Sequence, residues 1–256
     1  MATTKQSVEV FDIPEIVRGR IQVCILGTSP LLCNRMPEKA MRQLLAPPAR
    51  RSKSQMEATM KHEPILEFRA SPYILRDPKA PTLLAMLPTA LKSAMRTAAL
   101  DLPGAKKAQV GRLVQVNWDR QPVFGIPKLH MAIVRNSDIN HTPDVRTRAC
   151  LKEWACKFEV SFTKTILREQ SILNLIVAAG MQSGIGDWRQ EKGSGSYGSF
   201  EIVAPDHPDF VRIVKTGGRK AQQEAMDNPE CYDEESAELM AWYEPEMKRR
   251  GFKVAA

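Results

Sequence analysis

The chain has 256 residues, of which 43% are hydrophobic and 26% are charged, a composition typical of a globular protein with a sizeable core and unlike that of a disordered chain. The net charge of +8 is unevenly spread, because the segment from Asp206 onward has 8 basic and 11 acidic residues, or −3, which leaves +11 on the first 205 residues. A surface that binds polyanions is therefore expected in the first four-fifths of the chain.

Several function classes are disfavoured by what the sequence lacks. Its five cysteines form no CxxC pair, which favours reduced thiols in a cytoplasmic protein. The N-terminal segment has no apolar region of the kind found in secretory signals, and no run approaches the length of a membrane span. The phosphate-binding, zinc-protease and serine-hydrolase motifs are absent, so we expect neither a metal nor a cofactor.

The first predicted elements are a strand and a short helix joined to a basic segment. Arg20–Leu26 is apolar and β-branched, which predicts a buried strand, and Pro37 begins a helix that Pro47 stops. The stretch 35–61 is either a solvated loop or a flap that contacts phosphates. Its seven basic residues, against two glutamates, are Arg35, Lys39, Arg42, Arg50, Arg51, Lys53 and Lys61.

An irregular segment and a clear helix follow. Ile65–Leu75 alternates weakly and contains a proline, which predicts an edge strand or hairpin. Thr89 is a plausible N-cap for a helix that ends by Gly104. Lys92 and Arg96 lie four residues apart on one face of this helix, which indicates either a nearby anion or a solubilising surface.

The second half predicts strands at Val110–Val116, Lys128–Val134 and Trp154–Phe162, and a mostly buried helix at Leu167–Met181. The polar stretch Asn136–Arg148 is expected to be a protruding hairpin or loop. A glycine-rich loop and the strand SFEIV complete the pattern.

This order of elements predicts an α+β fold with a ferredoxin-like, RNA-recognition-motif-like βαββαβ core. The expected organisation is an N-terminal arm (1–19), a core domain (20–204) with insertions at about 30–80 and 136–150, and a C-terminal extension (205–256) with a charged helix at Glu234–Arg249. The extension either docks on its own domain or contacts a neighbouring subunit.

The glycine-rich loop, residues 184–198, is the most informative stretch. Its glycines, which would let backbone amides approach a ligand, are Gly184, Gly186, Gly193, Gly195 and Gly198. Asp187, Trp188, Arg189 and Lys192 add charge and one aromatic ring, with Trp188 a candidate for base stacking. The loop follows a helix and precedes a strand, the reverse of nucleotide-cofactor loops. A plain flexible hairpin is the alternative.

Four segments together resemble the CRISPR-associated RAMP proteins. The loop reads Gly184-Ile185-Gly186, then Gly193-Ser194-Gly195 with Tyr197-Gly198, as in the glycine-rich loop of that family. The stretch MLPTALKSAMRTAA is similar to the start of the family's first helix: Leu87, Pro88, Leu91, Lys92 and Arg96 match, and Thr89 and Ser93 replace glycines. ILGTSPLL is similar to the exit of its first strand, and VRTRACLKEWACKFEVSF to the end of its thumb and the strand that re-enters the sheet.

The resemblance is nearest to the repeating backbone subunit of CRISPR effector complexes, a modified RNA-recognition fold that polymerises along guide RNA. It implies that Lys92, Arg96 and the glycine-rich loop hold the RNA backbone, and that the thumb at Asn136–Arg148 reaches over a neighbouring copy. The RNA-binding residues expected on this basis are Lys92, Arg96, Arg35, Arg42, Arg50, Arg51, Arg146, Arg148, Gly184, Gly186, Trp188, Arg189, Lys192, Gly193 and Gly195. The implied partners are guide RNA (crRNA), a DNA or RNA target paired with it, further copies of the chain and other effector-complex subunits.

Catalysis is not expected. RNA-cleaving relatives carry an aspartate in the loop after the first strand, and Thr28–Met41 contains none. Two alternatives remain open: a phage or plasmid protein that binds or anneals single strands, and a ribonuclease that processes structured RNA through His141 or His62.

Overall fold

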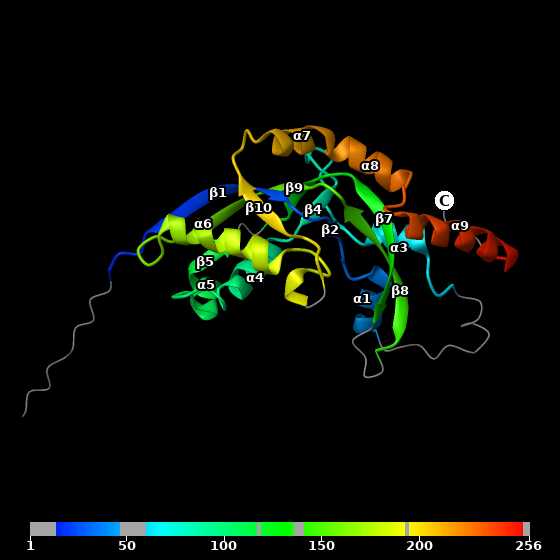
Figure 1. Ribbon diagram of the computed structural model, residues 1–256, viewed down its shortest axis with the longest axis horizontal. Coiled ribbons are helices and arrows are strands. Elements are labelled where there is room, and N and C mark those ends of the chain that lie inside the picture. The colour runs from blue at the N-terminus through cyan, green and yellow to red at the C-terminus, as the bar shows by residue number, and fades with distance from the viewer. Residues whose placement is uncertain (1–13, 47–59, 117–118, 136–140, 193–194, 253–256) are drawn as a thin grey trace, which may run out of the picture.

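The computed structural model describes residues 14–46, 60–116, 119–135, 141–192 and 195–252, which form two antiparallel sheets covered by helices (Figure 1). The predicted α+β class is confirmed. None of the helices in these ranges is long and apolar enough to cross a membrane.

The two long strands of the larger sheet, β1 (Arg18–Gly27) and β9 (Ala155–Thr163), lie side by side within it. Its strands lie in the order β10 (Phe200–Val203), β1, β9, β6 (Gln121–Phe124), β4 (Leu84–Met86) and β3 (Tyr73–Ile74), and β5 (Val114–Val116) pairs with β9. The registers are antiparallel, with Ile25 of β1 opposite Cys156 on β9 and Ile202 on β10.

One face of the larger sheet carries the main core. The helices on this face are α4 (Pro88–Ala98), α5 (Lys107–Leu113) and α6 (Glu169–Ala178). Leu91 and Met95 of α4 and Ile176 of α6 are buried against Ile25 and its neighbours. The helix period of the apolar residues in α4 and α6 therefore matches the face that each helix buries.

The opposite face is covered by the extension. Helix α7 (Pro208–Thr216) packs Phe210 and Ile213 against Cys24 and Leu26 of β1. Because both faces of β1 are covered at this end, its residues from Val23 to Leu26 are all buried, which explains the continuous apolar run in the sequence.

The smaller sheet is a hairpin with one short strand at its edge. Its order is β2 (Leu31–Leu32), β8 (Pro143–Leu151) and β7 (Pro127–Arg135). Helix α3 (Pro64–Ala70) covers one face of this sheet, where Phe68 packs with Leu129 and Ala149. Helix α1 (Glu38–Leu45) follows β2 along the chain, as Pro37 predicts.

The C-terminal extension continues along the body through α8 (Arg219–Asp227) and α9 (Glu234–Arg249), which reach the hairpin (Figure 1). Gln222 of α8 is fully buried. Its amide nitrogen donates to the carbonyls of Val123, Gly125 and Gly217, and its amide oxygen accepts from the backbone nitrogens of Leu83 and Leu84. The extension therefore docks on its own chain, one of the two alternatives above.

Three local predictions are wrong. The segment predicted as an edge strand at Ile65–Leu75 is mainly helix α3, because Pro64 begins a helix and Ile65 and Phe68 share its buried face. The first half of the strand predicted at Val110–Val116 is helix α5, so only its last three residues pair in the sheet.

The polar stretch Asn136–Arg148 was predicted to be a protruding hairpin or loop, and the hairpin alternative is confirmed, because residues from Pro143 onward form strand β8, which pairs with β7. Residues 136–140 of the predicted thumb lie outside the described ranges. The third wrong prediction is the N-cap of α4, which begins at Pro88 with Leu87 as its N-cap, so Thr89 does not cap it.

Replacing Gln222 by Leu keeps the volume but leaves five backbone groups without their side-chain partner. We expect the free energy of unfolding to fall by about 3 kcal/mol or more, because each buried polar group left unpaired costs roughly 1–3 kcal/mol. Urea unfolding followed by circular dichroism measures this loss. The control is Gln223→Leu, one residue along on the exposed side of α8, which should stay within about 0.5 kcal/mol of the parent.

Candidate nucleic-acid interface

Helix α4 presents two cations beside the glycine-rich loop. Its buried face carries Leu91 and Met95, while Lys92 is half-buried and Arg96 is exposed. The Arg96 side chain runs over α5 at Gly111, where an added Cβ would lie 3.3 Å from its Nε. Within the described residues, no carboxylate lies within ion-pair distance of either cation, so neither charge is neutralised there.

Two hydrogen bonds attach the glycine-rich loop and the helical turn just before it to this helix. The π-helical turn η1 (Ala179–Ser183) extends α6 and ends at Ser183, whose hydroxyl donates to the carbonyl of Ala94 over 3.3 Å. The hydroxyl of Thr97 donates to Oε1 of Glu191 over 3.2 Å, in the short 3₁₀ helix η2 (Gln190–Lys192). The structure thus brings together two features that lie about ninety residues apart in the sequence.

The charge of Arg189 is satisfied inside the loop. Its Nε donates to Glu191 over 2.9 Å and its Nη1 donates to the carbonyl of Gly186 over 2.9 Å. Arg189 therefore shapes the loop instead of presenting a free cation. The side chain of Lys192 and the whole of Gly193 lie outside the described residues.

The glycines of this loop allow two backbone segments to cross closely, rather than opening backbone amides to a ligand. Gly198 has φ +74° and donates to the carbonyl of Pro30 over 2.8 Å, and a Cβ there would collide with the backbone of Ile185. Gly186 has φ +89° and lies against Leu31 and Leu32 of β2. Gly184, also at positive φ, closes the turn after η1, and Gly195 crosses the backbone of Trp188.

A buried ion pair joins the loop to the hairpin. Arg148 of β8 is 5% exposed, and its Nη1 donates to Oδ2 of Asp187 over 2.7 Å. The same oxygen accepts from Nδ2 of Asn34 over 3.0 Å, and the Asp187 amide donates to the carbonyl of Leu32. Burial lowers the pKa of Arg148, which nevertheless stays protonated. Arg148 was predicted to contact RNA; in the structure its charge is paired with Asp187 and its side chain is enclosed, and the pair joins the loop to the hairpin.

The elements that carry the other described cations, α1 and β8, lie on the other side of the loop from α4 (Figure 1). Arg146 is exposed on β8, two residues before Arg148 and on the same face of the strand. Arg35 is half-buried between β2 and α1, and Arg42 of α1 pairs with Glu38. Arg50 and Arg51 lie outside the described residues. The described cations therefore flank the loop and do not form a single cluster.

Three aromatic residues near the loop were missed by sequence reasoning. The ring of Trp188 stacks on Tyr197, with ring centroids 5.9 Å apart and planes 20° apart. Tyr197 also contacts His130 of β7, which in turn contacts Tyr232 from the extension. Only Tyr197 carried a signal, since it lies in the loop; the others come from segments distant in the sequence.

His62, a candidate catalytic residue of the ribonuclease alternative, is held by carboxylates on both ring nitrogens. Nδ1 lies 3.1 Å from Glu67 and Nε2 lies 3.1 Å from Asp144, which also pairs with Lys61. The hydrogen bond with Glu67 raises the pKa of His62. With both nitrogens occupied, His62 is poorly placed to move a proton on a substrate. Across the described part of the chain, no three His, Cys, Asp or Glu residues are grouped to hold a metal.

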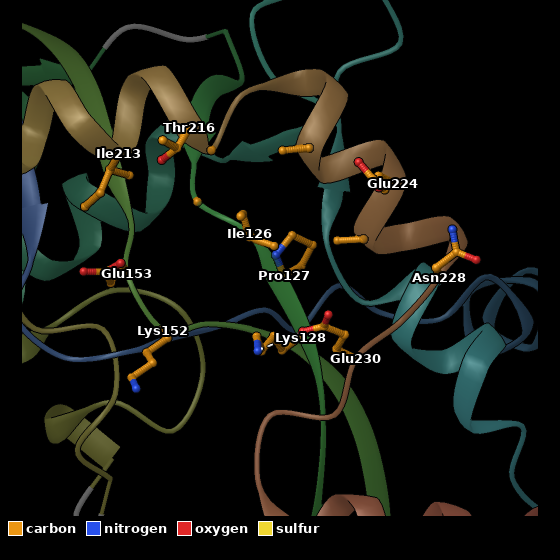
Figure 2. A pocket seen from close by; sticks show the side chains of 14 residues that line it. Ile126, Pro127, Lys128, Lys152, Glu153, Ile213, Thr216, Glu224, Asn228 and Glu230 are labelled. Atoms are coloured by element: carbon orange, nitrogen blue, oxygen red, sulfur yellow. Dashed lines mark ion pairs between the residues drawn. The ribbon is translucent and has the colours of Figure 1, made fainter.

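A cavity of about 490 Å³ lies elsewhere, between α7, α8 and the turns that precede β7 and β9 (Figure 2). Ile126, Pro127 and Ile213 give it an apolar lining, and Lys128 pairs with Glu230 over 3.0 Å at its rim. It contains none of the predicted RNA-binding residues.

No protein-family model and no curated protein sequence matches the chain. Among solved structures, the chain is similar to Cmr6 from Pyrococcus furiosus, with 10% sequence identity and a TM-score of 0.37 over 74% of this chain and 100% of that one. A TM-score this low supports no inference about function.

Removing the carboxylate of Asp187 leaves the buried guanidinium of Arg148 without its counter-charge. We expect Asp187→Ala to lower the free energy of unfolding by about 3 kcal/mol or more, as measured by urea unfolding. Adding Arg148→Met should recover part of this loss, because the unpaired charge is gone. The surface pair of Asp209 and Arg212 supplies the control, and Asp209→Ala should cost about 1 kcal/mol or less. Equal losses for the two aspartates would show that the buried pair has no anchoring role.

The His62 cluster predicts a dependence of stability on pH. The raised pKa of His62 gives stability that is complete below its ordinary pKa of 6.5 and is lost as pH rises through the folded pKa. Burial alone would raise the pKa of Glu67, but its bond to His62 lowers it, so this contribution is present above 4.5 and lost as pH falls.

The contributions of His62 and Glu67 are both present between pH 4.5 and pH 6.5, so the cluster stabilises the fold most in this range. In urea unfolding at about pH 5.5 and about pH 8.5, the parent should lose more stability on going to the higher pH than His62→Gln does. Identical pH dependence in the two proteins would contradict the role of His62.

Proposed function

We propose that this chain binds single-stranded RNA without regard to its sequence, as a repeating backbone subunit along the guide RNA of a CRISPR effector complex, and that it does not cleave RNA. The observation that carries the proposal is the attachment of the cationic face of α4 to the glycine-rich loop through Ser183 and Thr97. These are two of the four segments that resemble the RAMP proteins in sequence.

The order of strands also supports a RAMP-like core. If β1, β5, β9 and β10 are taken as strands one to four of a βαββαβ unit, their order in the sheet is four, one, three, two. Helices α4 and α6 lie on one face of these strands. This is the arrangement expected of a ferredoxin-like or RNA-recognition-motif-like unit. The other long elements, α3 and the hairpin of β7 and β8, then correspond to insertions.

The chemistry favours contacts to the RNA backbone over contacts to base edges. Lys92 and Arg96 are cations without a carboxylate partner among the described residues, and cations on a solvent-facing helix attract phosphates of any sequence. The excess of +11 on the first 205 residues adds a long-range attraction. Further copies of the chain, other complex subunits and a DNA or RNA target paired with the guide are the partners that this role requires.

Binding without cleavage is part of the proposal. The loop after β1 contains no aspartate, and both nitrogens of His62 are bonded to carboxylates. His141, the other histidine considered, is exposed beside the hairpin. The role also requires neither metal nor cofactor.

The double substitution Lys92→Glu with Arg96→Glu tests the binding face. Its affinity for a single-stranded RNA of mixed sequence should fall at least about 10-fold at about 100 mM salt, and the dependence of log K on log salt should flatten by about 1.4, because two phosphate contacts are lost. Fluorescence anisotropy across a salt series measures both quantities, and assembly along long RNA is followed by sedimentation.

A matched control reverses the same number of charges on the far side of the larger sheet. Lys215 and Lys220 are exposed on α7 and α8, and Lys215→Glu with Lys220→Glu should change affinity much less. If both double variants lose the same RNA affinity, net charge alone explains the binding and the face of α4 has no special part in it. Copurified DNA or RNA of mixed length would favour a single-strand annealing protein, and cleavage of hairpin RNA lost in His141→Ala would favour the ribonuclease.

A further inference from the structure

Four aromatic rings lie in series between the glycine-rich loop and the extension, and we call Trp188, Tyr197, His130 and Tyr232 the aromatic row. The centroid distances along it are 5.9 Å from Trp188 to Tyr197, 6.1 Å from Tyr197 to His130 and 5.4 Å from His130 to Tyr232. The planes of the first pair are nearly parallel, at 20°, and those of the last pair are nearly perpendicular, at 86°. Three segments distant in sequence therefore converge on one structure.

The outer end of the row is presented to solvent. Trp188 is 37% exposed although one face of its ring stacks on Tyr197. Its backbone has φ +48°, in the left-handed region that bulky residues rarely adopt. The Tyr197 amide donates to the Trp188 carbonyl over 3.3 Å, and the neighbouring residue Arg189 forms a β-bridge with Tyr197. A large ring held rigidly at a strained position without being buried suggests a binding role.

The inner end of the row is fixed by the extension. His130 is 7% exposed, and burial lowers its pKa, so the ring is neutral near pH 7. Residues Glu230 to Tyr232 pair with β7 through Leu129, whose amide donates to Glu230 and whose carbonyl accepts from Tyr232, both over 2.8 Å. Asp233 lies 3.5 Å from Nε2 of His130 and caps α9.

The charges near the row leave room for the uncharged, flat faces of nucleic-acid bases. The guanidinium of Arg148 and the carboxylate of Asp187 neutralise each other beneath the loop, so the row itself faces no unpaired charge from that pair. The two cations of α4 lie on the side of the loop that is bonded to that helix. Phosphates and bases of one strand can therefore be held by different sides of the same loop.

We propose that the exposed face of Trp188, backed by Tyr197, stacks one base of a bound single strand, and that His130 and Tyr232 are positioning residues that hold Tyr197 in place. Aromatic stacking is tolerant of base identity, because every base has a flat face. The proposal rests on the proposed function, since it assumes that a single strand follows the loop. It adds a contact to the bases, and it gives the C-terminal extension a part in RNA binding.

The test compares binding of a uridine-rich RNA with that of an oligonucleotide of equal length made of abasic spacers. Trp188→Ala should weaken binding of the RNA by about 5- to 100-fold, the range measured for loss of one stacked base, and should leave binding of the abasic strand unchanged. Trp188→Phe should retain most of the affinity. Tyr232→Ala should lower RNA affinity by a smaller factor, and Tyr232→Phe should restore it, also without effect on the abasic strand.

Trp242 is the matched control. It is 62% exposed on α9 and belongs to no ring pair in the described structure, so Trp242→Ala should bind RNA like the parent. If the parent binds RNA and Trp188→Ala binds it equally well, the stacking proposal is wrong and the proposed function stands. If Trp188→Ala weakens binding of the RNA and of the abasic strand equally, the ring supports the fold of the loop and the stacking proposal is also wrong. A parent that binds neither strand overturns both proposals.

Discussion

The buried ion pair between Arg148 and Asp187 fixes the glycine-rich loop on which the proposed interface depends. A guanidinium that is 5% exposed must have a counter-charge, since an unpaired buried charge costs several kcal/mol. The carboxylate of Asp187 also accepts a hydrogen bond from Asn34, and the backbone amide of Asp187 donates to the carbonyl of Leu32. These bonds therefore hold the loop against the hairpin. The bond is directional as well as electrostatic, so it orients the residue that follows it, Trp188.

The same loop is attached on its other side to α4, which makes it the connection between the two halves of the molecule. Ser183 and Thr97 bond it to the helix that carries Lys92 and Arg96. The chain crosses itself at Gly198 and passes closely over β2 at Gly186, where a side chain would collide. Glycine at these positions permits dense packing of backbone on backbone. Rigidity of the loop, more than amide groups open to a ligand, is what the glycines supply.

The sequence predicts elements with a clear period and misses features that depend on distant contacts. Strand β1 follows from its continuous apolar run, strand β9 and helices α4, α6 and α9 follow from the spacing of their apolar residues, and the i, i+4 spacing of Lys92 and Arg96 predicts their shared face. Helix α3 was missed because seven residues are too few for its period to be distinguished from a weak strand. The pairing of Arg148 with Asp187 and the row from His130 to Tyr232 could not be predicted, because each joins segments separated by tens of residues and a lone arginine in a strand carries no sign of burial.

The uneven charge of the sequence has a spatial counterpart. The extension, with its excess of acidic residues, covers the face of the larger sheet opposite α4, and its helices run on to the hairpin (Figure 1). Its carboxylates therefore do not lie over Lys92 and Arg96. Where it does approach the glycine-rich loop, it brings Tyr232 and Asp233 to His130. An acidic segment placed in this way leaves the phosphate-facing helix unneutralised. It also repels a polyanion from the back of the sheet, which favours one path for a bound strand.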